Sequence, residues 1–147
     1  MDAGLIVLAA CAALYLYVAG GCWMLQVVGY PTYELVGERE FVPFHVDFGK
    51  RLIPIFVGPA VLACLLSFVL LAVRPTSVPL WLVGVVALCS AVILVTTIVI
   101  EVPKHNALDS GGKSSALIAG LVRDNLPRAI GWTIGSVLLV YALVGLR

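Results

Sequence analysis

The residues best suited to acid–base chemistry in this chain stand at the edges of long apolar runs. Glu101 and Arg128 each adjoin such a run, and ionisable side chains at membrane depth are costly and therefore candidates for function. Histidine as a residue type titrates near neutral pH, which makes His45 a candidate for acid–base use, and the amide of Asn125 can donate hydrogen bonds to a developing anion. The predicted catalytic residues are His45, Glu101, Asn125 and Arg128. Glu101 and Arg128 either enclose a ligand or pair with each other, and the sequence leaves both alternatives open.

A second set of polar and aromatic side chains could hold a substrate beside these candidates. Trp23, Gln26 and Tyr30 have the spacing i, i+3 and i+7, which places them on one helical face. Trp and Tyr also collect at the membrane–water interface, so an aromatic belt is an alternative interpretation that does not explain Gln26. The predicted substrate-binding residues are Gln26, Tyr30, His105, Asn106 and Trp132.

The two histidines also raise the question of a cofactor. Imidazole binds both metals and haem, so a haem or metal held by His45 and His105 is an alternative. The chain contains no CxxC, CxxCH or HExxH motif, so no motif requires a cofactor and no metal site is predicted. The cysteines all lie in apolar runs, where small buried hydrophobic side chains are expected: Cys11, Cys22, Cys64 and Cys89.

Composition indicates that these residues belong to a membrane protein. Of the 147 residues, 62% are hydrophobic and 12% are charged, and the mean hydropathy is +1.12. A soluble domain carries about 25% charged residues. Several apolar runs approach the ~20 residues that cross a bilayer, and a net charge of +1 gives no indication of nucleic-acid binding. The predicted spans are 4–28, 53–73, 78–100 and 128–146.

These spans predict a single all-α domain over residues 1–147, an antiparallel four-helix transmembrane bundle. Proline disfavours helix in the residue before it, so the first helix is expected to end before Tyr30-Pro31 and the third at Val102-Pro103. Glu101 and His105 are then not assured of a common helical face despite their i, i+4 spacing. Residues 114–122 carry an apolar stripe and are expected to form a short interfacial helix before the fourth span.

Charge distribution suggests an orientation in the membrane. Four spans place the polar segments 29–52 and 101–127 on one side, together with all Lys and Arg except Arg74 and Arg147. The positive-inside rule predicts that these two segments are cytoplasmic, although most acidic residues share that side. The expected location is a bacterial inner (plasma) membrane.

Short motifs spread along most of the chain resemble a family of small four-helix membrane proteins. They are Gly29-Tyr30-Pro31, residues 41–51 with His45, Thr96 through Val102-Pro103 to His105-Asn106, and Asn125 to Trp132 with Arg128. The family is largely a domain of unknown function and includes anthrone oxygenases of polyketide pathways. Its members often read VPLHxxL…NWxR where this chain reads VPKHNAL…NLPR. The resemblance implies a four-helix fold and an enzyme that oxidises an apolar phenolic or quinone-like compound at one membrane face.

Two further functions are consistent with the sequence, so whether the protein is an enzyme stays open. One is a non-enzymatic accessory or assembly subunit of a membrane complex, because Gly20-Gly21 permits close helix contact and the charged segments could form a docking rim. The other is a haem- or metal-binding membrane protein. The expected partners are the lipid bilayer, a small apolar ligand, and a membrane-protein partner or second copy of the chain, without nucleic acid.

Overall fold

The structure, a computed structural model, describes residues 3–146. Throughout that range it contains no strand, and four helical segments are long and apolar enough to cross a membrane. The all-α class and the four apolar helices are therefore confirmed. These segments have 30 to 36 residues each; at about 1.5 Å per residue they are longer than a hydrocarbon core of about 30 Å. The four segments are Ala3–Leu35, Glu38–Val73, Leu80–Gly111 and Ser115–Val144.

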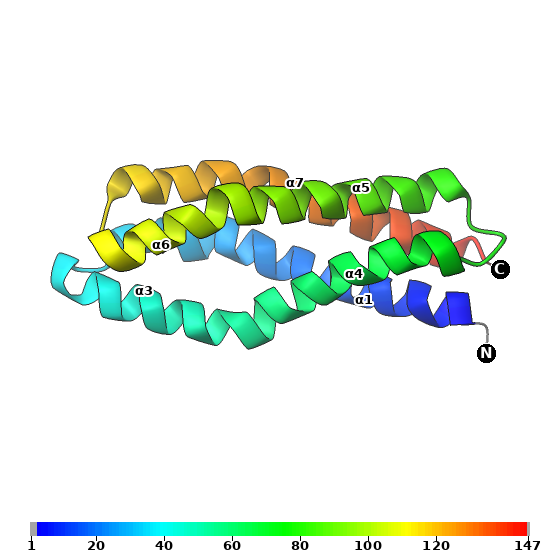
Figure 1. Cartoon of the computed structure of the whole chain (residues 1–147), viewed down its shortest axis with the longest axis horizontal. Coiled ribbons are helices and arrows are strands. Elements are labelled where there is room, and N and C mark those ends of the chain that lie inside the picture. Colours follow the sequence, from blue (N-terminus) through cyan, green and yellow to red (C-terminus); the bar gives the residue numbers. More distant parts are fainter. Residues whose placement is uncertain (1–2, 147) are drawn as a thin grey trace.

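The four segments lie side by side along the long axis of the molecule, and both chain ends are at the same end (Figure 1). Helices α1 (Ala3–Met24) and α5 (Leu80–Thr96) both pack against α4 (Gly58–Val73) and against α7 (Ser115–Val144). These contacts enclose a core of buried apolar side chains that runs along the bundle.

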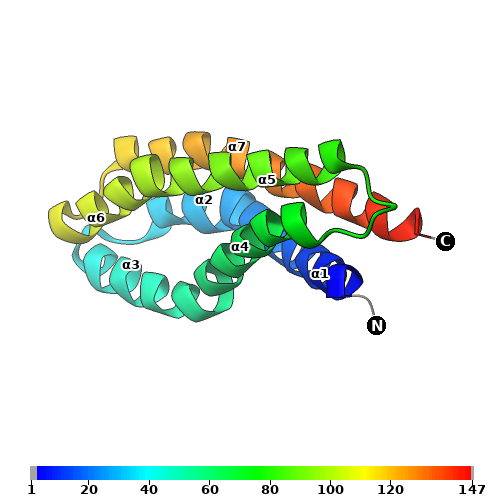
Figure 2. The same cartoon turned by 45° about the vertical axis from the view of Figure 1, so that its right-hand side comes forward.

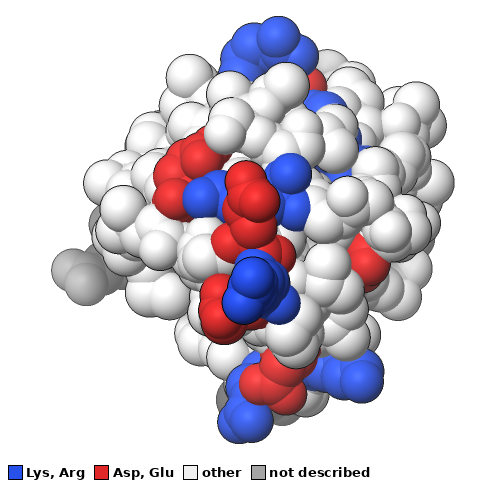
Figure 3. Space-filling view, turned by 90° about the vertical axis from the view of Figure 1, so that its left-hand side faces the viewer, with Lys and Arg blue, Asp and Glu red and all other residues white. Residues whose placement is uncertain are grey.

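The end of the bundle away from the termini carries most of the charge. It is formed by α3 (Glu38–Leu52) and α6 (Val102–Gly111), which contact each other, and by the first turns of α7. Figure 3 shows Lys, Arg, Asp and Glu side chains spread across this end. Lys113 joins two of its segments, because its Nζ donates to the carbonyls of Glu34 at 2.7 Å and Val36 at 3.0 Å.

Three of the long helical segments each continue past a proline through a short, wider turn. Turn η1 (Leu25–Gly29) leads through α2 (Tyr30–Thr32) into the 3₁₀ turn η2 (Tyr33–Leu35). Turn η3 (Ile53–Val57) joins α3 to α4, and η4 (Thr97–Glu101) joins α5 to α6. The predicted helix ends at Tyr30-Pro31 and Val102-Pro103 are therefore wrong.

The physical reason lies in the carbonyl that each proline ring faces. A proline within a helix has no N–H and crowds the carbonyl four residues earlier. For Pro31, Pro59 and Pro103 that carbonyl belongs to Val27, Ile55 and Val99, each inside one of the three π-turns. A π-turn adds one residue to the turn, which gives the ring room while the helix goes on. The freed Ile55 carbonyl accepts a hydrogen bond from Tyr17 Oη at 2.6 Å.

The last long helix also differs from its prediction. Residues 114–122 do not form a separate interfacial helix; they are the beginning of α7, which starts after a cap at Ser114 and passes through Pro127. The apolar stripe faces inward, since Ile118 and Leu121 are buried. Burial of two such side chains contributes about 3–6 kcal/mol, which offsets the ~3 kcal/mol that a proline costs within a helix.

In the middle of the bundle, Tyr15 holds four helices together. Its ring meets Trp132 edge-on at 4.7 Å between centroids. Its hydroxyl hydrogen-bonds with Ser90 and lies 3.2 Å from the Val86 carbonyl, and Ser67 Oγ donates to Ser90 Oγ at 2.7 Å. All four cysteines are free; three are buried as predicted and Cys89 is half-buried.

Gly135 provides a test of this packing. A Cβ at this position would overlap the ring of Tyr15, so we expect Gly135→Ala to lower the free energy of unfolding by about 1–3 kcal/mol through overpacking. Gly84 is the matched control, because a Cβ there has nothing within 4 Å. Gly84→Ala should be neutral or stabilising, since alanine has the higher helix propensity. Thermal unfolding in detergent would measure both, and equal stability of the two variants would contradict this packing.

Candidate functional site

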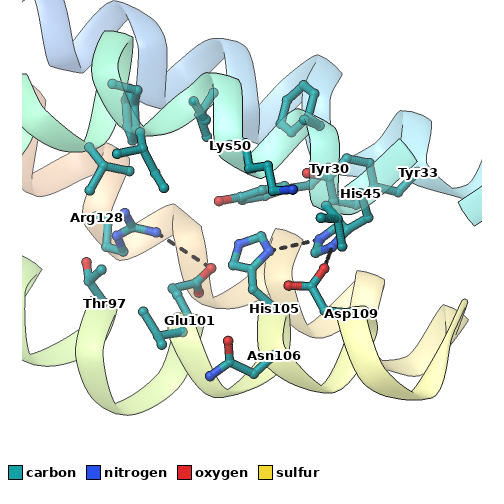
Figure 4. Close-up of a pocket in the computed structure, with 18 residues that line it drawn as sticks. Tyr30, Tyr33, His45, Lys50, Thr97, Glu101, His105, Asn106, Asp109 and Arg128 are labelled. Carbon is teal, nitrogen blue, oxygen red and sulfur yellow. Dashed lines mark hydrogen bonds and ion pairs between the residues drawn. The ribbon is translucent and has the colours of Figure 1, made fainter. Parts of the chain in front are cut away.

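A cavity of about 430 Å³ opens at the charged end of the bundle (Figure 4). Its walls come from α2, η2, α3, η3, η4, α6 and α7. Its volume lies in the range of roughly 300–1,000 Å³ that is usual for small-molecule sites. Six of the predicted site residues line it: Tyr30, His45, Glu101, His105, Asn106 and Arg128.

The continuous helix through η4 and α6 brings three ionisable residues to this cavity. Glu101, His105 and Asp109 have the spacing i, i+4 and i+8, and all three line it. Such residues share a face of an uninterrupted helix. The sequence did not assure a common face for Glu101 and His105. They share one because the helix continues through Pro103, which lies in the first turn of α6 directly after the π-turn η4.

His45 connects Asp109 to His105. Its Nδ1 lies 2.6 Å from Asp109 Oδ1, and its Nε2 lies 3.0 Å from His105 Nδ1. The His45 side chain is buried, and its ring packs edge-on against Tyr33 at 5.2 Å and is stacked with Phe41 at 5.5 Å. These two rings fix the orientation of the imidazole.

The direction of these hydrogen bonds follows from the carboxylate. With Asp109 ionised, His45 Nδ1 carries the hydrogen, and Nε2 of neutral His45 accepts from His105 Nδ1–H. His105 Nε2 is then an acceptor with no hydrogen-bond partner among the described residues. Figure 4 shows that this second nitrogen is turned away from His45, toward the side of the cavity that holds Glu101 and Arg128. The arrangement therefore presents a basic imidazole nitrogen to the cavity.

With its Nδ1–H directed at His45, the ring of His105 is neutral when Nε2 carries no hydrogen, and the neutral ring is the form that can accept a proton.

Glu101 and Arg128 form an ion pair with each other, and both also line the cavity. Their pairing therefore leaves both side chains next to the space where a ligand could lie. Arg128 Nη1 lies 3.6 Å from Glu101 Oε2, which is an ion pair without a hydrogen bond. Glu101 is only 2% exposed, yet neither of its carboxylate oxygens has a hydrogen-bond partner in the described chain. Leaving a buried charged group without such partners is costly, so this carboxylate is suited to accept a hydrogen bond from a ligand.

The side-chain amides of Asn125 and Gln26 form a hydrogen-bonded chain that orients the Arg128 guanidinium. Arg128 Nη1 donates to Asn125 Oδ1 at 3.1 Å, Asn125 Nδ2 donates to Gln26 Oε1 at 2.9 Å, and Gln26 Nε2 donates to the Val122 carbonyl at 2.9 Å. Asn125 and Gln26 do not line the cavity. They reach it through the guanidinium that they orient.

Two tryptophans from the sequence predictions lie outside the cavity: Trp132, a predicted substrate-binding residue, and Trp23, which was predicted to share a helical face with Tyr30. Trp132 is buried one turn beyond Arg128 and packs against Tyr15, outside the cavity lining. Trp23 is exposed, and its Nε1 donates to Thr133 Oγ1 at 2.9 Å. The π-turn η1 lies between Trp23 and Tyr30 and breaks the regular helical spacing.

The sequence reasoning missed several cavity residues, of which Asp109 is the most informative. Its signal was present in the i, i+4, i+8 series from Glu101, but that series has meaning only if the helix passes Pro103. Three further polar cavity residues also escaped attention: Tyr33, Lys50 and Thr97. Nothing in their local sequence distinguishes them from ordinary interfacial residues.

The charged rim next to the cavity is stabilised by its own pairs. Lys104 Nζ contacts Asp124 and donates to the Gly120 carbonyl at 3.0 Å, while Arg123 Nε donates to Asp124 at 2.6 Å. Lys104 is thereby committed to α7 and does not line the cavity.

The described residues bear on the cofactor alternative as well. Both ring nitrogens of His45 are occupied by hydrogen bonds, which leaves one free nitrogen on His105. Within residues 3–146, no group of three or more His, Cys, Asp or Glu side chains is placed to hold a metal ion.

No protein-family model, curated protein or solved structure matches the chain.

Proposed function

We propose that the protein is an integral membrane enzyme of the anthrone-oxygenase type, which binds a flat, apolar phenolic or quinone-like compound in the cavity and removes a proton from it. The observation that carries the proposal is the Asp109–His45–His105 chain, which ends on a free imidazole nitrogen on the same side of the cavity as the Arg128 cation. A base and a cation at one apolar site suit proton removal that leaves an enolate or phenolate.

The proposed setting is an antiparallel four-helix transmembrane bundle. Large apolar side chains are exposed along all four helices, including Leu65, Leu88 and Val137. Contiguous apolar surface of this kind is rare on soluble monomers, and lipid would cover it. The cavity then lies at the charged end, where the helices leave the hydrocarbon core.

The acid–base step assigns a role to each cavity residue. His105 Nε2 takes a proton from the central CH₂ of an anthrone, which lies across the middle ring from the carbonyl and is acidic because the aryl rings conjugate the resulting anion with that carbonyl. Asp109, acting through His45, stabilises the imidazolium that forms and fixes its orientation. His45, a predicted catalytic residue, becomes the positioning residue between them, and His105 becomes the base.

The anion and the phenol are held on the other side of the cavity. Arg128 stabilises the negative charge on the enolate oxygen. Its guanidinium is oriented by Asn125, which is in turn hydrogen-bonded to Gln26. Glu101 has two unpartnered oxygens, which can accept a hydrogen bond from a phenolic hydroxyl. Tyr30 and Asn106 complete the wall against which the rings lie.

The oxidation itself uses molecular oxygen as the co-reactant. The electron-rich carbanion reacts with O₂ to form a C–O bond and, after protonation, a hydroperoxide. Loss of water from this hydroperoxide leaves a carbonyl. One oxygen atom of O₂ ends in the quinone and the other in water, and the carbon gives up the four electrons that O₂ accepts.

Turnover of anthrone to anthraquinone tests this assignment. In purified protein, His105→Gln and Asp109→Asn should each lower kcat/KM by about 10²–10⁴-fold, the range expected for loss of general base catalysis. Asp47→Asn is the matched control for Asp109→Asn, because Asp47 forms an exposed pair with Arg51 outside the cavity, and it should retain full activity. Anthraquinone would be quantified together with O₂ consumption.

Arg128 needs a paired substitution. Arg128→Gln alone would leave Glu101 as an unpaired buried charge, which is strongly destabilising, so it is combined with Glu101→Gln. We expect the double variant to fold and to lose turnover, whereas Arg123→Gln, at an exposed position of the same helix, keeps it. Full turnover in both His105→Gln and the double variant would refute the proposed function.

We also propose that the charged end faces the cytoplasm of a bacterial inner membrane, as the positive-inside rule predicts. Single cysteines at Ser110 and Thr76 would lie at opposite ends of the bundle. A membrane-impermeant maleimide should label Thr76→Cys on spheroplasts and Ser110→Cys only after permeabilisation, with the unsubstituted chain as background. The reverse pattern would invert the orientation.

A further inference from the structure

We propose that the ligand enters the cavity sideways from the bilayer, through a lateral opening whose edges are Ile53, Val57 and Val102. The inference rests on the proposed function, because it concerns how that ligand reaches the same cavity. It adds a route, and it identifies the three aliphatic side chains that set which ring systems can pass.

The edges of the opening are recognised by side chains that are both cavity-lining and exposed. Ile53 is 58% exposed, Val57 is 40% exposed and Val102 is 44% exposed, and all three line the cavity. A side chain can satisfy both conditions only at the boundary between the cavity and the outer surface. Phe56, which also lines the cavity, is 7% exposed and lies inside.

Two edges of the opening, Val57 and Val102, lie deeper along the bundle than the charged cavity residues Lys50 and Asp109. Val57 comes about two helical turns after Lys50, and Val102 about two turns before Asp109, so both are roughly 10 Å further along the bundle than those charges. The segments that follow Val57 and precede Val102 are the apolar runs 58–73 and 80–100. In the proposed membrane setting the opening therefore faces acyl chains.

On this side of the bundle the backbone of η3 stands away from the neighbouring helices. Figure 2 shows the chain bending at η3, so that α3 and η3 bow away from the neighbouring helices before α4 returns to them. The contacts of η3 are predominantly with its own flanking helices, α3 and α4. Pro54 lies within η3 and Pro59 directly follows it, at the first turn of α4, and such prolines with a π-turn are recognised causes of a sharp bend.

Two contacts fix the bend in position. Tyr17 donates to the Ile55 carbonyl at 2.6 Å, which anchors η3 to α1 at the point that proline leaves unpaired. Phe56 packs against Gly21, where an added Cβ would lie 2.9 Å from the phenyl ring. The opening is consequently a built part of the fold, held between an anchored π-turn and the end of η4.

The chemistry of the opening matches an apolar ring compound. Its edges are aliphatic, whereas the aqueous mouth is bordered by Lys50 and by Asp109, whose side chain is 40% exposed. A fused-ring phenol partitions into the bilayer, and passing between aliphatic side chains spares it the desolvation of those charged groups. The width between the three edge side chains then selects flat rings over bulky ones.

Association kinetics test the route independently of turnover. The probe is 2-naphthol, a fluorescent two-ring phenol, mixed by stopped flow with the full chain in liposomes. Val57→Trp and Val102→Trp should lower the association rate constant by about tenfold or more, and Ile53→Ala should raise it, within the one to three decades over which such constants vary between variants. Because Ile53→Ala is expected to raise the association rate constant, it tests the route even if a tryptophan variant folds poorly.

Two control variants distinguish entry through the lateral opening from entry through the aqueous mouth. Val95→Trp is the matched substitution at an exposed apolar position outside the cavity lining, and Lys50→Trp obstructs the aqueous mouth; both should leave the rate constant unchanged. A slower rate in Lys50→Trp with unchanged rates in the three edge variants would overturn the lateral route and leave the proposed function intact. Absence of saturable binding to the unsubstituted chain would overturn both.

Discussion

The architecture depends on how helical backbone accommodates proline in an apolar setting. A carbonyl opposite a proline ring loses its usual donor, and bilayer lipid offers no replacement. Here the carbonyls of Val27, Ile55 and Val99 all fall within π-turns, so each helix continues past the proline that would otherwise end it. Because the helices continue, their polar ends reach beyond the length of a hydrocarbon core and can gather a site there.

The same turns determine what the site contains. Passage of the helix through Pro103 puts Glu101, His105 and Asp109 on one face, and the cavity is lined by that face together with residues of α3 and η3. Aromatic rings then restrict His45 between Asp109 and His105. The π-turns and the candidate chemistry therefore have a common origin, since such turns frequently occur at functional sites.

Two hydrogen-bonded networks of polar side chains end at the cavity. Asp109, His45 and His105 form a chain that starts at a partly exposed carboxylate and ends on a neutral imidazole. Arg128, Asn125 and Gln26 form the other, in which amides satisfy part of the guanidinium and Glu101 supplies only charge. Within the described residues these networks are incomplete at the Glu101 oxygens, at Arg128 Nε and at His105 Nε2, and all three residues line the cavity.

The sequence by itself determined the apolar runs, the helical class and the clustering of His45, Glu101, His105 and Arg128 at one end, because these follow from composition and from the spacing of polar residues along the chain. It also contained the i, i+4, i+8 series that includes Asp109. Only the tertiary structure decided that the helix survives Pro103, where a π-turn gives the proline ring room, and that residues 114–122 belong to α7, where burial against neighbouring helices offsets the cost of Pro127. The contact of His45 with Asp109, 64 residues apart, is likewise a product of packing that no local pattern encodes.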